Sequence, residues 1–365
     1  MKTIQLKIQF RSYPILVGNR LLDKIPTLLP PYLSGSNIVV ITHPELSHLI
    51  EPFTPLQNAG FTIHPLLIPS GEPSKSWDMV DHIMTQLTQW GLDRHDTLVA
   101  LGGGVIGDLV GFAASIYMRG IRYVQIPTTV LAQVDSAIGG KTGVNHPRAK
   151  NLVGTFYQPH VTIADQSVLS SLPPREIKSG LAEIVKYGVI GNAGLFKYLE
   201  THAHSFASYQ PHEHPELWQH VITRSIGDKV KVVSQDERES GLRATLNFGH
   251  TLGHALESVS GYQHYTHGEA IALGMVGVSQ MAQSLGLLDP KSAQRIEGLL
   301  QQLGFDTTCE HGWPISDLLD IMRRDKKNKG HEIHWVIPSG IGVVDVMTGI
   351  PEDSVRTMLK RMGNQ

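Results

Sequence analysis

The stretch DTLVALGGGVIGD, residues 96–108, joins a short apolar run to a turn with three glycines. Gly102, Gly104 and Gly107 have the G-x-G-x-x-G spacing that connects a strand to a helix in dinucleotide-binding domains. Glycines let the backbone approach a pyrophosphate closely, and a helix N-terminus favours its negative charge. An ordinary strand-to-helix turn fits the same pattern. We therefore predict a strand, a tight turn and a helix here, with a nucleotide as the candidate ligand.

Strand-like and helix-like segments alternate on both sides of this turn. The strand-like segments are residues 1–10, 37–42, 61–69, 96–101 and 122–127, and the helix-like segments are 74–90 and 104 to about 118. This alternation predicts a mostly parallel sheet covered by helices on both faces, an α/β fold. Two details differ from the usual Rossmann pattern. The glycine turn does not follow the first strand, and no acidic residue ends a strand about 20 positions later.

The pattern changes near Leu172, beyond which helical periodicity dominates. The expected helices are residues 175–190, 215–233, 246–260, 267–285, 291–303 and 315–324, with one strand-like piece at 331–339. Residues 201–220 are rich in His, Pro, Ser and Gln and predict a solvated loop or a frayed helix. We therefore expect two domains, an α/β parallel-sheet domain at 1–172 and a mainly α-helical domain at 173–365.

The composition narrows the classes of function. Of 365 residues, 41% are hydrophobic and 18% charged, and the net charge is −2, without a basic arm for nucleic acid. No apolar run approaches membrane-spanning length, and the first residues read as a strand rather than a signal peptide. Cys309 is the single cysteine, which fits a reducing, cytoplasmic compartment. The 19 histidines direct attention to metal or proton chemistry.

A second glycine-rich stretch, SAIGGKTGVN at residues 136–145, resembles a phosphate-binding P-loop without matching it. The motif requires a glycine where Asp135 stands. A lysine flanked by glycines remains, Lys141, which is either an exposed lysine or a contact for a phosphate or cofactor. The turn IPSGEPSK, residues 68–75, also leaves a strand and could reach the same crevice.

Histidines gather in NFGHTLGHALESVSGYQHYTHGEA, residues 247–270. His250 and His254 are four apart and share one face of a helix, and His267 stands at the start of the next expected helix. Catalytic zinc commonly takes three protein ligands. Glu183, with Lys186 one turn later, is a polar position in an apolar helix and could supply the third. The alternatives are hydrogen-bonded histidines without a metal, and acid–base work by His254.

A polar stripe precedes these histidines. Arg243, Asn247, His250 and His254 are spaced by four, three and four residues, which predicts one continuous helical face. A polar stripe leading into candidate metal ligands indicates an anionic, oxygen-rich substrate. An ordinary charged helix and loop would have the same composition.

Five segments together resemble the 3-dehydroquinate synthase family, one of the sugar phosphate cyclases. They are GGGVIGDLVGF, IPTTVLAQVDSAIGGKTGVN, SGLAEIVKYG, DERESGLRATLNFGHTLGHALE and HGEAIALGM. They occur in the family's order and span about residues 70 to 340. The resemblance implies an N-terminal Rossmann-like NAD-binding domain and a C-terminal metal- and substrate-binding domain, with the active site in the cleft. It implies conversion of the sugar phosphate DAHP to 3-dehydroquinate and phosphate in the shikimate pathway.

The resemblance also implies roles for individual residues. The zinc or cobalt ligands would be Glu183, His250 and His267, with His254 as a proton-handling group. The NAD contacts would be Ser70, Gly71, Glu72, Pro73, Ser74, Lys75, Gly104, Val105, Ile106, Gly107, Asp108, Thr128, Thr129, Asp135, Lys141, Lys150, Asn151, Val168, Leu169, Ser170 and Ser171. The substrate contacts would be Lys141, Lys186, Lys229, Arg243, Asn247, the pair Lys326 and Lys327, and Glu239 nearby. Arg119 matches an arginine that a neighbouring subunit donates, which implies a homodimer.

Three other functions remain open at this point. A metal-dependent alcohol dehydrogenase of the glycerol dehydrogenase type shares the glycine turn and the H-x-x-x-H helix, but it would not need Lys186, Lys229, Arg243 and Asn247. Other sugar phosphate cyclases are possible, although the DERESGLR segment and His254 favour 3-dehydroquinate synthase. A catalytically silent NAD-binding regulator would keep the turn and lose metal ligands.

Overall fold

A computed structural model describes residues 1–9, 11–147, 149–324 and 332–365. The chain forms two compact units, Met1–Leu172 with Pro215–Arg238, and Pro173–His214 with Glu239–Gln365. This grouping differs from the expected division into two contiguous segments at residue 172. The reason is helix α7 (Pro215–Gln235), which packs against the first strand of the chain and so belongs with the first unit.

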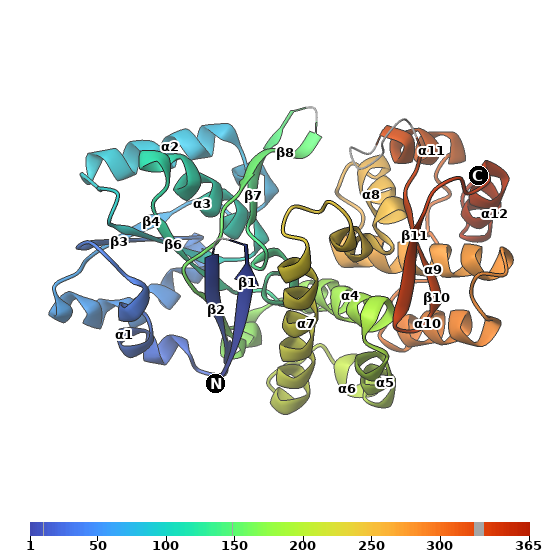
Figure 1. Cartoon of the computed structure of the whole chain (residues 1–365), viewed down its shortest axis with the longest axis horizontal. Helices are drawn as coiled ribbons and strands as arrows, with labels where there is room; N and C mark the ends of the chain where they lie inside the picture. Colours follow the sequence, from blue (N-terminus) through green and yellow to red (C-terminus); the bar gives the residue numbers. More distant parts are fainter. Residues whose placement is uncertain (10, 148, 325–331) are drawn as a thin grey trace. The chain divides into compact units, whose positions relative to one another are not determined.

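A seven-stranded sheet forms the centre of the first unit (Figure 1). Its strands, in spatial order, are β1 (Lys2–Ile8), β2 (Arg11–Gly18), β9 (Thr162–Asp165), β6 (Arg122–Pro127), β5 (Thr97–Gly102), β3 (Asn37–Thr42) and β4 (Thr62–Leu67). β1 runs antiparallel to β2, and the other neighbours are parallel. The predicted α/β fold with a parallel sheet is therefore confirmed.

Side chains of the central strands alternate between two hydrophobic cores. Val39 and Ile41 of β3 face the core beneath α2 and α3, whereas Ile38 and Val40 face the core beneath α1. A strand buried on both faces needs apolar residues at every position, which explains the continuous apolar runs in the sequence. The helices that flank the sheet are α1 (Ile25–Leu28), α2 (Trp77–Gln89) and α3 (Gly104–Ile116).

A hairpin of β7 (Lys141–His146) and β8 (Ala149–Phe156) begins within the second glycine-rich stretch. The sequence predicted only a turn here, because glycine and polar residues are poor strand signals. Gly139 and Gly140 have φ values of 96° and 67°, which lie in the left-handed region that favours glycine. Lys141 then begins β7, so the lysine is held by a paired strand rather than by a loose turn.

The second unit is mainly helical, as predicted. Its helices are α4 (Pro174–Gly191), α5 (Ala193–Thr201), α6 (Ala203–Phe206), α8 (His250–Val259), α9 (His267–Ser284), α10 (Pro290–Gln302), α11 (Ile315–Arg324) and α12 (Glu352–Arg361), with the strand pair β10 (Trp335–Gly340) and β11 (Val343–Met347). The stretch 201–220, expected as a solvated loop or a frayed helix, contains the short helix α6, and the helix predicted at 215–233 matches α7. Helix α5 was not predicted. Within the described ranges, no helix has the length and apolarity to cross a bilayer.

His160, which precedes β9, provides a test of the first unit. Burial, with Arg11 and Arg122 nearby, lowers the pKa of His160 to about 3. The unfolded chain binds a proton at this histidine below about pH 6.5, whereas the folded chain does not. The free energy of unfolding should therefore fall as the pH decreases from about 6.5 towards 3.

The His160→Gln variant should show a shallower fall in the free energy of unfolding across this pH range. The difference in slope is at most about 1.4 kcal/mol per pH unit, reduced because the side chain is partly exposed to solvent. Urea unfolding at a series of pH values measures it. His82→Gln, at an exposed site on α2, is the control. Equal slopes in wild type and His160→Gln would contradict the prediction.

Candidate active site

The glycine turn enters α3 through Gly103, which provides no side-chain cap. A Cβ atom on Gly103 would lie 3.2 Å from Cγ2 of Thr129, and one on Gly104 would lie 3.1 Å from Oγ of Ser136. The first N–H groups of a helix have no partner within the helix, and the helix dipole favours an anion there. The tight turn and the first amides of α3 fit the pyrophosphate of a dinucleotide.

Lys75 connects three of the segments expected to contact the cofactor. Its Nζ lies 2.5 Å from Oδ2 of Asp108 on α3 and also donates a hydrogen bond to Oδ1 of Asn151 on β8. Beside it, Nδ2 of Asn145 donates to Oε1 of Glu72 at 2.7 Å. Burial raises the pKa of Asp108, and the ammonium of Lys75 opposes this shift. The IPSGEPSK turn, the glycine-turn helix and the hairpin thus meet at one polar cluster.

Asp135 and Lys229 form a second polar contact in the first unit. Nζ of Lys229 lies 2.6 Å from Oδ1 of Asp135 and 2.6 Å from its carbonyl oxygen, and Lys229 is only 5% exposed. The family resemblance implied a cofactor contact for Asp135 and a substrate contact for Lys229. α7 brings them together because it packs on the turn Ala132–Ser136 that contains Asp135.

The remaining candidates of the first unit lie on loops and strand ends. Thr128 is buried after β6, Lys141 is exposed at the start of β7, and Lys150 is half-buried on β8. The segment 168–171 forms part of the 3₁₀ turn Gln166–Ser171. Arg119 is exposed, with a left-handed φ of 62°.

In the second unit, three candidate metal ligands converge from three helices. Glu183 of α4 is fully buried, and its Oε1 lies 3.5 Å from Nε2 of His250 and 3.4 Å from Nε2 of His267. One ligand atom from each residue lies within 4.8 Å of the others. A carboxylate and two imidazoles suit a borderline divalent cation such as zinc or cobalt. Lys186, one turn after Glu183 and also buried, forms an ion pair with it.

The second nitrogen of each imidazole has its own partner. Nδ1 of His250 contacts the carbonyl oxygen of Phe248 at 3.0 Å, and Nδ1 of His267 lies 3.5 Å from Oε2 of Glu257. Such partners orient a metal-binding histidine. Burial opposes the charged form of His267, but hydrogen bonds to Glu183 and Glu257 outweigh it and raise the pKa of His267 to about 10. The two carboxylates therefore favour a cation here.

Glu257 is a functional candidate that the sequence interpretation did not assign. It lies three residues after His254, so both side chains share one face of α8. The ring centroid of His254 is 5.3 Å from that of His250 and 6.1 Å from that of His267. His254 thus lies at the edge of the cluster, near the ligands, where a proton-transferring group would stand.

Glycines allow α8 and α9 to approach closely enough to bring His250 to His267. A Cβ on Gly274 would lie 1.9 Å from the carbonyl oxygen of Gly249, and one on Gly253 would lie 3.0 Å from that of Ala270. Gly268 has a similar role against α4, because its Cβ would lie 2.1 Å from the carbonyl oxygen of Ser179. The convergence of Glu183, His250 and His267 therefore depends on close backbone contacts that only glycine permits.

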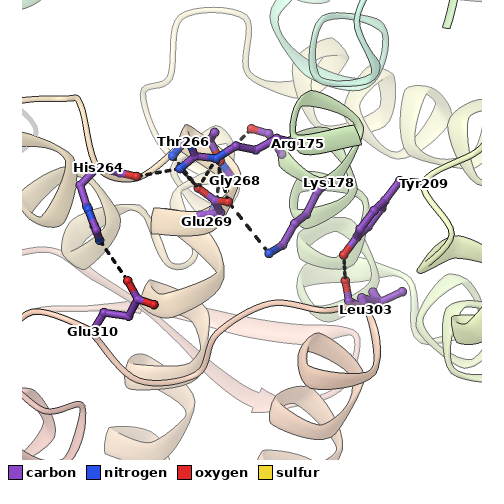
Figure 2. A network of polar contacts seen from close by, with 10 residues as sticks. Arg175, Lys178, Tyr209, His264, Thr266, Gly268, Glu269, Leu303 and Glu310 are labelled. Carbon is purple, nitrogen blue, oxygen red and sulfur yellow. Dashed lines mark hydrogen bonds and ion pairs between the residues drawn. The ribbon is translucent and has the colours of Figure 1, made fainter. Parts of the chain in front are cut away.

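Arg175 and Glu269 hold the start of α9, which carries His267 (Figure 2). Nη2 of Arg175 lies 2.8 Å from Oε2 of Glu269, and Nε of Arg175 donates to both carboxylate oxygens. The same carboxylate accepts from the amide of Thr266 at 2.8 Å and completes a capping box. This arrangement satisfies N-terminal amides and fixes the backbone from which His267 projects.

The continuous helical stripe expected from Arg243 to His254 is wrong. Arg243 and Asn247 lie on the 3₁₀ segment Leu242–Asn247, and Gly249 has a left-handed φ of 78°, so a new helix begins at His250. Arg243 is nevertheless buried, and Nδ2 of Asn247 donates to Oε1 of Glu239 at 2.9 Å.

Lys326 and Lys327, the last predicted substrate contacts, lie outside the described residues.

Comparison with known proteins supports the resemblance to the 3-dehydroquinate synthase family along nearly the whole chain. The family models for the 3-dehydroquinate synthase N-terminal and C-terminal domains match residues 65–179 and 180–328. A 3-dehydroquinate synthase of Thermodesulfovibrio yellowstonii is 43% identical over 98% of this chain and 99% of its own length. Another, from Desulforamulus reducens, is 41% identical over 99% of this chain and 100% of its own length.

A solved structure shares the fold. The 2-epi-5-epi-valiolone synthase of Streptomyces hygroscopicus subsp. jinggangensis 5008, with NAD+ and Zn2+ bound, has a TM-score of 0.88. It is 28% identical and covers 98% of each chain. With two matched domain models and relatives above 40% identity over nearly full length, this chain belongs to the 3-dehydroquinate synthase family.

Proposed function

We propose that this protein converts 3-deoxy-D-arabino-heptulosonate 7-phosphate (DAHP) to 3-dehydroquinate with release of phosphate, the second step of the shikimate pathway. The observation that carries the proposal is the convergence of Glu183, His250 and His267 in a chain of this family. We propose NAD and a zinc or cobalt ion as its cofactors, as in the valiolone synthase structure that binds NAD+ and Zn2+.

The described residues fit both cofactors. The glycine turn and the cluster around Lys75 would bind NAD, and Glu183, His250 and His267 would bind the metal ion. When bound, NAD accepts a hydride from the sugar and later returns it, and the metal lowers the pKa of the hydroxyl being oxidised.

The other polar residues would bind the substrate and transfer protons. Lys186, Arg243 and Asn247 would hold the carboxylate and hydroxyl groups of the sugar phosphate, which suits charge-assisted hydrogen bonds from Lys and Arg. His254, at the edge of the metal cluster, would relay protons to and from the sugar hydroxyl. The leaving phosphate would be stabilised by Lys141, Lys229 and the Lys326–Lys327 pair. Glu239 would orient Asn247, because its Oε1 accepts a hydrogen bond from Nδ2 of Asn247 at 2.9 Å.

The reaction distinguishes this function from a simple dehydrogenase. Purified protein incubated with DAHP, NAD and zinc should release one phosphate for each 3-dehydroquinate formed, without a net increase in NADH. Phosphate assay, absorbance of NADH and identification of the carbon product measure all three. NADH that accumulates in proportion to substrate would instead indicate an alcohol dehydrogenase, and a different cyclic product would indicate another sugar phosphate cyclase.

Lys141→Ala should lower the affinity for NAD or kcat/KM by about 10- to 100-fold. A hydrogen bond to a charged group contributes about 1.5–3 kcal/mol, and Lys141 is exposed, so its loss should leave the fold intact. NAD titration and steady-state kinetics measure the two effects. Lys231→Ala, another exposed lysine, on α7, is the matched control. Unchanged NAD affinity together with unchanged turnover would remove Lys141 from the site.

We propose that the protein is a homodimer in the cytoplasm, and Arg119 allows a test of the dimer. If each subunit donates Arg119 to its neighbour, Arg119→Ala and His250→Ala should each be nearly inactive. Purified mixed dimers of the two variants should then regain about half of wild-type activity, because one of their two sites has both residues intact. Activity of the mixture after tag-based purification of mixed dimers measures this. No recovery in purified mixed dimers would show that Arg119 acts within its own subunit, and wild-type activity of Arg119→Ala alone would remove Arg119 from the site.

A further inference from the structure

A second group of potential ligands lies in the helical unit, apart from the cluster around Glu183. It consists of His264, Glu310 and His311, here called the peripheral cluster, and one ligand atom from each lies within 4.8 Å of the others. Nε2 of His264 is 3.7 Å from Oε2 of Glu310, and the ring centroids of His264 and His311 are 4.3 Å apart. The His264 side chain points at the Glu310 carboxylate (Figure 2).

The backbone on both sides of the peripheral cluster is held by contacts that need no metal. The carbonyl oxygen of His264 accepts a hydrogen bond from Nη2 of Arg175 at 2.7 Å. On the other side, the amide of Cys309 donates to the carbonyl oxygen of Met362 at 2.8 Å, and the amide of Trp313 donates to Oδ1 of Asn364 at 3.2 Å. The backbone that carries the three side chains is therefore held in place, which reduces the ordering cost of binding a ligand.

We propose that the peripheral cluster binds a divalent transition-metal ion of the zinc or nickel class. Two imidazoles and one carboxylate are the ligands that such ions prefer, whereas calcium and magnesium prefer oxygen alone. Metal–ligand bonds of about 2.0–2.1 Å in a tetrahedron place ligand atoms about 3.3–3.4 Å apart. The 3.7 Å between His264 and Glu310 is within a small side-chain adjustment of that spacing.

An ion bound at the peripheral cluster would affect the stability of the folded chain, because of where the cluster lies. His264 lies on the loop that ends at Thr266, the N-cap of α9, and Glu310 and His311 lie on the segment before α11. A bound ion would cross-link these two segments. Because binding to the folded state alone stabilises it, occupancy of the peripheral cluster should raise the unfolding temperature beyond the effect of the metal at Glu183.

The principal test is the zinc stoichiometry of the intact protein. Wild type should bind one zinc ion tightly through Glu183, His250 and His267, and a second ion at least about tenfold more weakly. Glu310→Gln and His311→Ala should each lose only the weaker ion, and His250→Ala should lose only the tighter one. His212→Ala, at an exposed histidine outside both clusters, should retain both. Equilibrium dialysis with metal analysis measures each case.

Trp313 offers a second, independent readout. Its ring is stacked on that of His311, with centroids 5.9 Å apart. Nickel added to protein already loaded with zinc at the tight site should quench tryptophan fluorescence saturably. The quenching should disappear in His311→Ala and shrink in Trp313→Phe, which should still bind the ion. The proposal would be overturned if Glu310→Gln and His311→Ala kept the zinc stoichiometry and quenching of wild type. It would also be overturned if wild type bound only one zinc ion. Neither result depends on enzyme activity, so the proposed function would be unaffected.

Discussion

His250→Ala should lose both bound metal and activity, with activity falling by at least about 10³-fold. The imidazole contributes one of three converging ligand groups, and its Nε2 lies 3.5 Å from Oε1 of Glu183. A metal ion contributes several kcal/mol to stabilising charge in a transition state, and about 4 kcal/mol corresponds to 10³-fold. Metal analysis of the purified variant and steady-state kinetics with DAHP measure the two losses together.

The control for His250→Ala is His204→Ala, at an exposed histidine on α6. It should keep wild-type metal content and activity. Added zinc should raise the unfolding temperature of wild type and of His204→Ala. The increase should be smaller for His250→Ala, because this variant lacks the tight site. Circular dichroism separates loss of metal from loss of fold. Full zinc occupancy at the tight site in a folded His250→Ala would remove this residue from the ligand set.

Gly274→Ala should destabilise the helical unit by more than about 3 kcal/mol and reduce the yield of folded protein. The added Cβ would lie 1.9 Å from the carbonyl oxygen of Gly249, which is backbone and cannot rotate away. Overpacking between rigid backbones forces helices apart. Because α8 carries His250 and α9 carries His267, the same shift should weaken metal binding in any protein that folds. Urea unfolding and zinc titration measure both effects.

The matched control for Gly274→Ala is Gly298→Ala on α10, where a new Cβ has no neighbour within 4 Å. Alanine is favoured over glycine in a helix by up to about 1 kcal/mol, so this variant should be slightly more stable than wild type. The two substitutions are chemically identical, but they should change the free energy of unfolding in opposite directions. Equal unfolding midpoints for both variants would show that α8 and α9 do not pack as closely as the structure places them.

Local patterns in the sequence predicted the secondary structure well where one element alone decides it. The apolar runs at 37–42 and 122–127 match β3 and β6, and the periodic stretch at 315–324 matches α11. The helix-like stretch 74–90 contains α2, whose N-cap Ser76 accepts a hydrogen bond from the amide of Met79. These features depend on neighbours within a few residues, so their signals are local.

The predictions failed where a distant contact or one backbone angle decides the outcome. Gly249 adopts a left-handed conformation against α9, and this interrupts the stripe from Arg243 to His254. Strand β7 lacks a strong local signal, whereas helix α5 was missed although Asn192 caps it and Leu195 and Leu199 share its buried face. α7 belongs with the first unit because of its packing against β1, which helical periodicity cannot reveal.

By itself, the sequence determined the parallel α/β fold followed by helices, the glycine turn and the residue types suited to a cation and an anionic substrate. Resemblance of its motifs supplied the candidate ligand set. Only the tertiary structure decided that Lys75 meets both Asp108 and Asn151, and that Glu257 supports His267. The physical reason is that periodicity and turn residues report the conformation and burial of each segment. Contacts between residues far apart in the chain depend on how those segments pack.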